Sequence, residues 1–499
     1  MITMRLTGED LGRLPGVRDQ LERIGADLAL GRSCLWLMPD ELVAHGIAGE
    51  LHRMVLDRCP ERIDVPEPTT ATEQPPKTFE TSWPPYAAGD VPLLDGFDDG
   101  FDIGWDFPRA CADAPRSPRD TGPSELMSRL AKELSVDPGR TVDELTDPVA
   151  QWRPVIGIRA WAEPGSAQGP GGREADRGQD IARLVRALGA AAKDVGLPPE
   201  KRPRVMVTSR LQDLPSLLPD ELELELATSA VHWWWGTMGR LDTATLLAGL
   251  RGSLIPGPSR TSGAALRTRV LRAVREEVVG ELSGPDIGLA MELLGRWDGS
   301  DRTLDESLRA CLVALRRDLG SDCPAIRSGA GVQHKPPSAL RQAWADGIVQ
   351  SWEGRPRVHP AVWHRDGGSG RPDQLNILVS QAQARVLMPW LEDARRRLAE
   401  VALAYVNRPV KELVELHMRN RLPDYRTRPE RTFRCAEPGD LLRACNEEHV
   451  RLPSEERRLL RSLVAARNAL SHREALSDSA LGELCERLAE ADRRWVRDE

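Results

Sequence analysis

A short polar segment near the C-terminus combines an arginine with a histidine. Residues 467–472 read Arg-Asn-Ala-Leu-Ser-His, and Arg467, Asn468 and His472 are the residues able to do chemistry. A guanidinium stays charged and offers a planar set of donors to phosphate oxygens, while an imidazole both gives and takes protons near neutral pH. These residue types predict acid–base chemistry at a phosphodiester. The alternative is a polar helix face that only meets water.

The surrounding sequence predicts a helical hairpin. Residues 453–456 read Pro-Ser-Glu-Glu, a helix start with Ser454 as the N-cap and two acids in the first turn. In that helix Asn468 and His472 are one turn apart, and so are Arg467 and Ser471, so we expect these four residues to form one polar stripe. A second helix is expected after Ser477, because apolar residues then recur at helical spacing. The polar segment therefore ends the first helix of the hairpin.

An Arg-polar-x-x-x-His pattern at this place resembles that of HEPN domains, small helical bundles many of which cleave RNA without a metal. The resemblance implies a site formed where two such domains meet over one RNA backbone, with no cofactor. It also implies that His472 activates the ribose 2′-OH or protonates the leaving oxygen, that Arg467 stabilises charge on phosphorus, and that Asn468 orients His472 or the phosphate. Expected helices across residues 381–499 match a HEPN domain in size.

The length, the net charge and the cysteine content limit the classes of protein to which this chain can belong. A chain of 499 residues should hold several domains, and its net charge of −8 argues against a general nucleic-acid coat. Residues 395–434 are locally basic and precede the polar segment. No apolar run is long enough to cross a membrane, so we expect a cytoplasmic protein. The eight cysteines are scattered without metal-ligand spacing, which predicts buried thiols.

The first half of the chain predicts an α/β fold with a doubly wound parallel sheet. Helical segments alternate with strands of apolar, β-branched and aromatic residues. The expected strands are residues 34–38, 63–65, 155–161, 204–208 and 229–235. Residues 67–149 are rich in Pro, Gly and Asp and predict an insertion or linker. Within it, the aspartates of residues 94–107 lack the spacing of a calcium loop, so we expect an acidic-aromatic loop that docks on a neighbour.

Two segments resemble STAND NTPases, a signalling branch of the P-loop ATPases. Residues 204–210 read Arg-Val-Met-Val-Thr-Ser-Arg, and a Gly-Pro helix segment follows at residues 284–295. The resemblance implies an NTPase-like core over residues 1–66 and 150–260. It further implies a helical lid and a possible winged helix over residues 261–380, ahead of the HEPN-like bundle of residues 381–499.

The phosphate-binding loop of that family is missing. A working loop needs a Gly-Lys-Ser/Thr element, yet no lysine follows a glycine in this chain. The expected place, residues 38–43, carries Asp40 and Glu41, which would repel phosphate, and the strand at 155–161 has no terminal acid. The chain should therefore not hydrolyse ATP.

Inactive STAND-like proteins are associated with bacterial conflict and antiphage operons, often together with HEPN effectors. The combined resemblance implies a defence ribonuclease acting on RNA, either as a homodimer or in a complex with operon-encoded defence proteins. Two alternatives remain. One is a non-enzymatic scaffold or sensor that assembles with partner effectors, and the other is a nucleotide-binding module in which Arg210 and Arg240 meet a phosphate.

Overall fold

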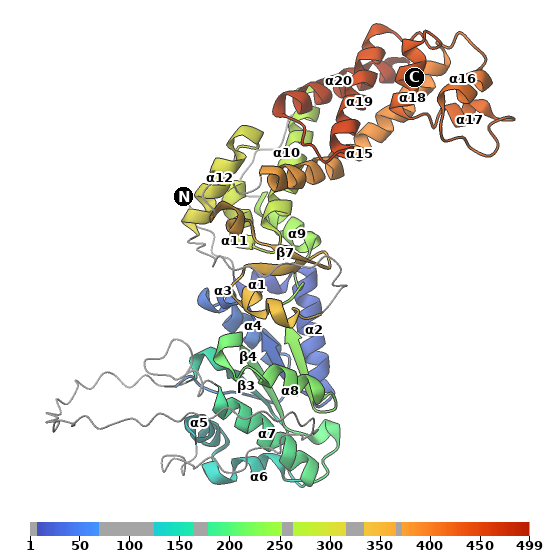
Figure 1. Ribbon diagram of the computed structural model, residues 1–499. Helices are drawn as coiled ribbons and strands as arrows, with labels where there is room; N and C mark the ends of the chain where they lie inside the picture. The colour runs from blue at the N-terminus through green and yellow to red at the C-terminus, as the bar shows by residue number, and fades with distance from the viewer. Residues whose placement is uncertain are drawn as a thin grey trace, which may run out of the picture.

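The computed structural model describes residues 7–68, 124–163, 178–251, 263–315, 334–365 and 372–498. Figure 1 shows an elongated molecule with an α/β part at one end and a group of helices at the other. Among the described residues, no helix is both long enough and apolar enough to cross a membrane.

The α/β part contains a five-stranded parallel sheet with strand order β2-β3-β4-β1-β5. The strands are β1 (Ser33–Leu37), β2 (Arg62–Asp64), β3 (Val155–Arg159), β4 (Arg204–Ser209) and β5 (Ser229–Trp233). These bounds lie within a few residues of the expected ones, and the predicted parallel α/β sheet is confirmed. The strands are recognisable from sequence because a parallel sheet covered by helices buries nearly continuous apolar runs.

Helices connect the strands and share one apolar core with the sheet. They are α1 (Gly8–Gly12), α2 (Pro15–Ala29), α3 (Asp40–Ala44), α4 (Ile47–Leu56), α7 (Gln179–Asp194) and α8 (Leu218–Leu224). The tryptophans at 233, 234 and 235 are all buried, as expected for a core strand and its continuation. They are thus not exposed for base stacking.

Part of the expected insertion belongs to the folded core. Helices α5 (Glu125–Leu134) and α6 (Thr141–Thr146) lie before residue 150, and Leu126, Leu130 and Leu145 are buried in the same core as the sheet. Residues 124–149 therefore belong to the folded α/β part and not to an insertion, because these leucines form an apolar helix face that packs on its core. Residues 94–107, the expected docking loop, lie outside the described residues.

A mostly helical region follows the sheet. It begins with α9 (Arg240–Arg251), α10 (Gly263–Ser283), α11 (Ile287–Arg296), α12 (Asp301–Ala314) and α13 (Arg341–Ala345). The antiparallel hairpin of β6 (Val349–Trp352) and β7 (Arg355–Val358) comes next, and then α14 (Pro360–Arg365). The indole of Trp344 and the amide of Gln350 each donate a hydrogen bond of 3.0 Å to the carbonyl of Trp234. These two bonds attach α13 and the hairpin to the residue that follows β5.

The C-terminal helices form a bundle in which α15 is the longest. The bundle contains α15 (Pro372–Leu403), α16 (Val410–His417), α17 (Pro429–Phe433), α18 (Pro438–Asn446), α19 (Ser454–Ser471) and α20 (Asp478–Asp498). The helix α15 starts nine residues before the expected domain boundary at 381 and continues through Pro389.

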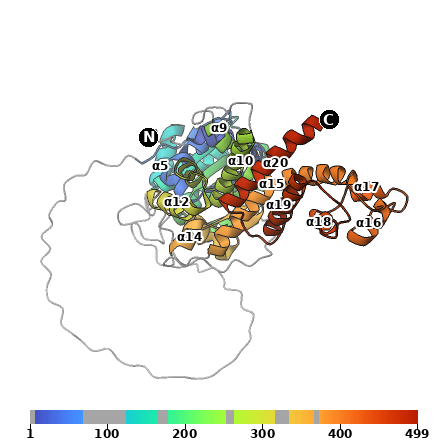
Figure 2. The ribbon, with the colours of Figure 1, turned by 90° about the horizontal axis from the view of Figure 1, so that it is seen from above.

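The bundle shares its core with the helices that precede it. One apolar cluster runs from Leu247 to Ala491, and α10 packs along α15 and α20 (Figures 1 and 2). The helices α9 to α12 and the bundle therefore form one packed unit, and the described core has no break near residue 381. Of the described cysteines only Cys435 is exposed, so the expected buried thiols hold for the other five.

Candidate functional site

The helix α19 carries Arg467 and Asn468, and His472 caps its C-terminus. Its buried side consists of apolar residues facing α15, α18 and α20, among them Leu459, Leu463 and Leu470. The helix begins at Ser454 and its N-cap is Pro453, so the expectation that Ser454 is the N-cap is wrong by one position. Pro453 lacks the side-chain oxygen that a serine N-cap would supply.

One exposed stripe runs the length of α19 and ends at the candidate residues. Its members follow one another at alternating spacings of four and three residues, and all are exposed: Ser454, Arg458, Arg461, Ala465, Asn468 and His472. Asn468 and His472 thus share a solvent-facing surface. Within the described residues, neither side chain has a hydrogen bond or ion pair. Both are therefore open to a ligand or to a partner.

Arg467 lies beside this stripe and is engaged with acids of neighbouring helices. Its guanidinium forms an ion pair with Glu437, the N-cap residue of α18, and both side chains are partly exposed. Together with Arg395, Arg467 also holds the pKa of Glu392 on α15 below its usual value. Arg467 is therefore drawn toward the packed side of the bundle, whereas Asn468 and His472 face solvent.

The turn after His472 is held in place by hydrogen bonds to side chains of α15. The backbone N–H of His472 donates to the carbonyl of Asn468 at 3.0 Å, and Arg473 adopts a left-handed conformation with φ of 60° that ends the helix. Gln383, which is buried, then accepts a hydrogen bond from the N–H of Leu476 at 2.7 Å and donates to its carbonyl at 2.9 Å. Asn376 accepts from the N–H of Ala475 at 3.0 Å.

These contacts give α15 a role in positioning His472 that the sequence reading missed. The sequence signal for this role was weak, because Asn376 and Gln383 are polar residues that share one face of α15 with Ser380. Such residues are common on helix surfaces, and only the packing of the turn against α15 distinguishes these two.

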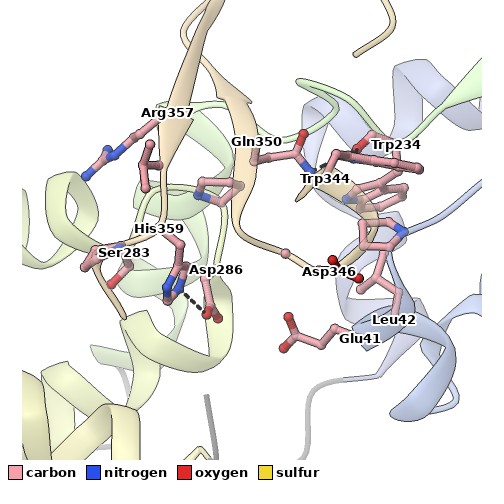
Figure 3. Close-up of a pocket in the computed structure, with 15 residues that line it drawn as sticks. Glu41, Leu42, Trp234, Ser283, Asp286, Trp344, Asp346, Gln350, Arg357 and His359 are labelled. Atoms are coloured by element: carbon pink, nitrogen blue, oxygen red, sulfur yellow. Dashed lines mark hydrogen bonds and ion pairs between the residues drawn. The ribbon is translucent and has the colours of Figure 1, made fainter. Parts of the chain in front are cut away.

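A second candidate place is the carboxyl edge of the sheet, where open α/β folds usually bind ligands. A small pocket with a volume of about 100 Å³ lies there. Figure 3 shows its lining, which comes from the segment after β1, the end of β5, the α10–α11 connection and the β6–β7 hairpin. The carboxylates of Glu41, Asp286 and Asp346 line it, and His359 lies 3.0 Å from Asp286. With three carboxylates against the single guanidinium of Arg357, this lining disfavours phosphate.

The residues that follow β1 at the carboxyl edge of the sheet are acidic and partly buried. Asp40 is the first residue of α3, directly after β1, and one of its carboxylate oxygens accepts a hydrogen bond of 2.6 Å from Gln212. Burial raises the pKa of Asp40 to about 6, against the opposing attraction of Arg210. The chain therefore places a desolvated carboxyl group at the carboxyl edge of the sheet, where it disfavours a bound anion.

Neither arginine proposed for phosphate contact is free. Arg210 is buried and donates two hydrogen bonds, of 2.7 and 2.8 Å, to Asp213. Arg240 pairs with Glu277 at 3.2 Å and with Glu281 at 2.8 Å, both on α10. Their interactions therefore support structural roles.

Together, the fold and these two places define an α/β protein with a parallel sheet and a largely helical C-terminal region. When the chain is compared with known protein families, curated proteins and solved structures, nothing matches it.

Proposed function

We propose that the C-terminal bundle is a metal-independent endoribonuclease of the HEPN kind whose active site contains Arg467, Asn468 and His472. The observation that supports this most directly is the exposed pair Asn468 and His472 at the end of α19, which has no partner within the described residues. Arg458 and Arg461 on the same stripe add positive charge that would attract an RNA backbone. The resemblance to STAND NTPases adds that the α/β part is an inactive scaffold that controls this activity in antiphage defence.

A second copy of the chain would complete the site. The alternating spacing of four and three along the exposed stripe of α19 is the spacing by which two helices pack along a seam. Ala465, in the middle of the stripe, leaves room for a close approach of the helices. Two facing copies of α19 would bring two His472 side chains to one phosphodiester.

The reaction would then be a transfer at phosphorus without a metal. One His472 takes the proton of the ribose 2′-OH, and the 2′-oxygen forms a bond to phosphorus. The bond from phosphorus to the 5′-oxygen breaks, and the other His472 supplies the proton to that oxygen. Arg467, released from Glu437, stabilises the negative charge on the phosphoryl oxygens, and Asn468 orients the imidazole or the phosphate.

A non-enzymatic scaffold is the competing function, and the ion pair between Arg467 and Glu437 favours it. In a scaffold, Arg467 would simply tie α19 to α18. The exposed stripe would then serve as a surface for assembly with partner proteins.

Cleavage of RNA by the purified full chain in the presence of EDTA tests the proposal. We expect cleavage that falls by about a hundredfold to ten-thousandfold in His472→Ala, since a proton shuttle is lost. The free energy of unfolding should change by only about 0.5 kcal/mol, as for other exposed positions. His45→Ala is the matched control, because His45 is also an exposed histidine that caps a helix C-terminus.

Growth of bacteria expressing the full chain gives a second readout. We expect expression to slow growth, and His472→Ala or Arg467→Ala to relieve the effect while His45→Ala does not. If a dimeric parent protein cleaves no RNA and is harmless, the ribonuclease proposal fails and the scaffold takes its place.

A further inference from the structure

Two histidines and a glutamate meet at the end of the bundle farthest from the sheet. His417 is the last residue of α16, while Glu447 and His449 lie in the connection between α18 and α19 (Figure 1). A bridge between Val406 and Val450 and a hydrogen bond of 3.1 Å from the N–H of Asn407 to the carbonyl of His449 hold this connection in place. The three side chains therefore converge from segments that are about 30 residues apart in sequence.

The ligand atoms of these side chains are arranged around a common centre. Nε2 of His417 lies 2.9 Å from Nδ1 of His449 and 3.9 Å from Oε2 of Glu447. Nδ1 of His449 lies 3.6 Å from the same carboxylate oxygen. A circle through three points with these separations has a radius of about 2.0 Å. Zinc binds histidine nitrogen and carboxylate oxygen at about 2.0–2.2 Å, so one ion would reach all three atoms.

The chemical nature of the three side chains, in addition to their geometry, is suited to binding a metal ion. His417 is buried, and both histidines present a ring nitrogen to the common centre, which is a ligand atom that Zn²⁺ prefers. The two rings are tilted by 53°, with centroids 5.1 Å apart, and they meet through their nitrogens. Glu447 supplies a negative charge from a half-exposed position.

We propose that His417, Glu447 and His449 bind one Zn²⁺ ion, with the fourth position open to solvent. Two histidines with one carboxylate form a recognised zinc ligand set, and the exposed side of the site at Glu447 leaves space for water. The ion fastens α16 to the connection between α18 and α19. Its expected effect is to stabilise this end of the bundle, and the proposed RNA cleavage does not depend on it.

Zinc content and zinc titration of the full chain test this inference. After removal of metal with a chelator and dialysis, we expect ZnCl₂ to bind with one equivalent per chain by calorimetry and to raise the midpoint of thermal unfolding. His449→Ala should weaken the affinity by about a hundredfold or more, because even loss of a supporting residue costs tenfold to a hundredfold. His472→Ala, which removes an exposed histidine elsewhere in the bundle, should leave the affinity unchanged.

The variant Glu447→Gln tests zinc binding without the risk of unfolding the protein. Glu447 is half-exposed, so its replacement disturbs no core packing. This variant should keep the parent's circular dichroism spectrum without zinc and should lose most of the zinc-dependent rise in the unfolding midpoint. The inference is overturned if the parent binds no Zn²⁺ at millimolar concentration. It is also overturned if His449→Ala and Glu447→Gln bind zinc as the parent does, since the contact between the rings is then an ordinary hydrogen bond.

Discussion

Arg210 and Asp213 form a two-bond ion pair at the carboxyl end of β4, and both side chains are almost completely buried. The pair lies beside Asp40, at the carboxyl edge of the sheet. Asp213 thus takes the place of an anionic ligand for Arg210. This arrangement occupies Arg210 with an internal partner at the carboxyl end of β4, and it leads to the first three predictions.

Replacing Asp213 with alanine should destabilise the protein by about 3–5 kcal/mol, because it leaves a buried guanidinium without its counter-charge. Denaturant unfolding followed by circular dichroism measures the effect. Asp180→Ala is the matched control, since Asp180 pairs with Arg183 at the same sequence spacing but on the surface. That change should cost about 1 kcal/mol or less. Equal losses for the two variants would contradict a stabilising role of the buried pair.

Replacing Asp40 with asparagine should stabilise the protein at high pH. The pKa of Asp40 is about 6 in the folded protein, above its ordinary value of 3.8, so the folded state binds more protons between these pH values. The free energy of unfolding therefore falls as pH rises through this window. At pH 8 Asp40→Asn should exceed the parent in stability by about 1–2 kcal/mol, allowing for partial solvent screening. The prediction is wrong if the free energy of unfolding of Asp40→Asn exceeds that of the parent by as much at pH 4 as at pH 8.

The protein should not hydrolyse ATP. The chain lacks a Gly-Lys-Ser/Thr element, and Asp40 and Glu41 stand at the place of the missing loop. Release of phosphate from magnesium-ATP should equal the background of a heat-inactivated sample. Magnesium-dependent turnover at about 1 per second or faster, within the ordinary range for enzymes, would refute the prediction.

Gln383→Ala should loosen the turn that follows His472. The change removes both hydrogen bonds to Leu476 and leaves its buried backbone groups unpaired, at a cost of about 1–3 kcal/mol. If His472 acts in cleavage, RNA turnover should fall while the pH dependence of the rate keeps its shape, because the imidazole is still present. Gln381→Ala, two residues earlier on α15, is the control and should leave both stability and turnover near those of the parent.

Glu437→Gln separates the two candidate functions. The change removes the charge that pairs with Arg467, so the guanidinium becomes free to reach a phosphate. A ribonuclease should keep or increase its rate of RNA cleavage, and the loss of a partly exposed ion pair should cost about 1 kcal/mol or less. A clear loss of assembly with partner proteins, without any RNA cleavage in the parent, would support the scaffold.

The sequence by itself determined the elements whose signal is local. Strands β1, β3 and β4 were predicted from their apolar runs, and α19 and α20 from the helical spacing of their apolar residues. Both patterns depend only on residues that are close together in the sequence. The absence of a phosphate-binding loop could be read in the same way. The exposure of Asn468 and His472 also followed from their place on the polar face of α19.

Tertiary structure decided what depends on contacts between distant segments. The strand order, the core shared across residue 381, the partner of Arg467 and the bracing of the turn by Gln383 appear only once the helices are packed. The convergence of His417 with Glu447 and His449 belongs to the same group, because no spacing along the chain indicates it. Helix and strand patterns determine which face of an element is apolar, whereas long-range packing determines which polar groups on different elements finally meet.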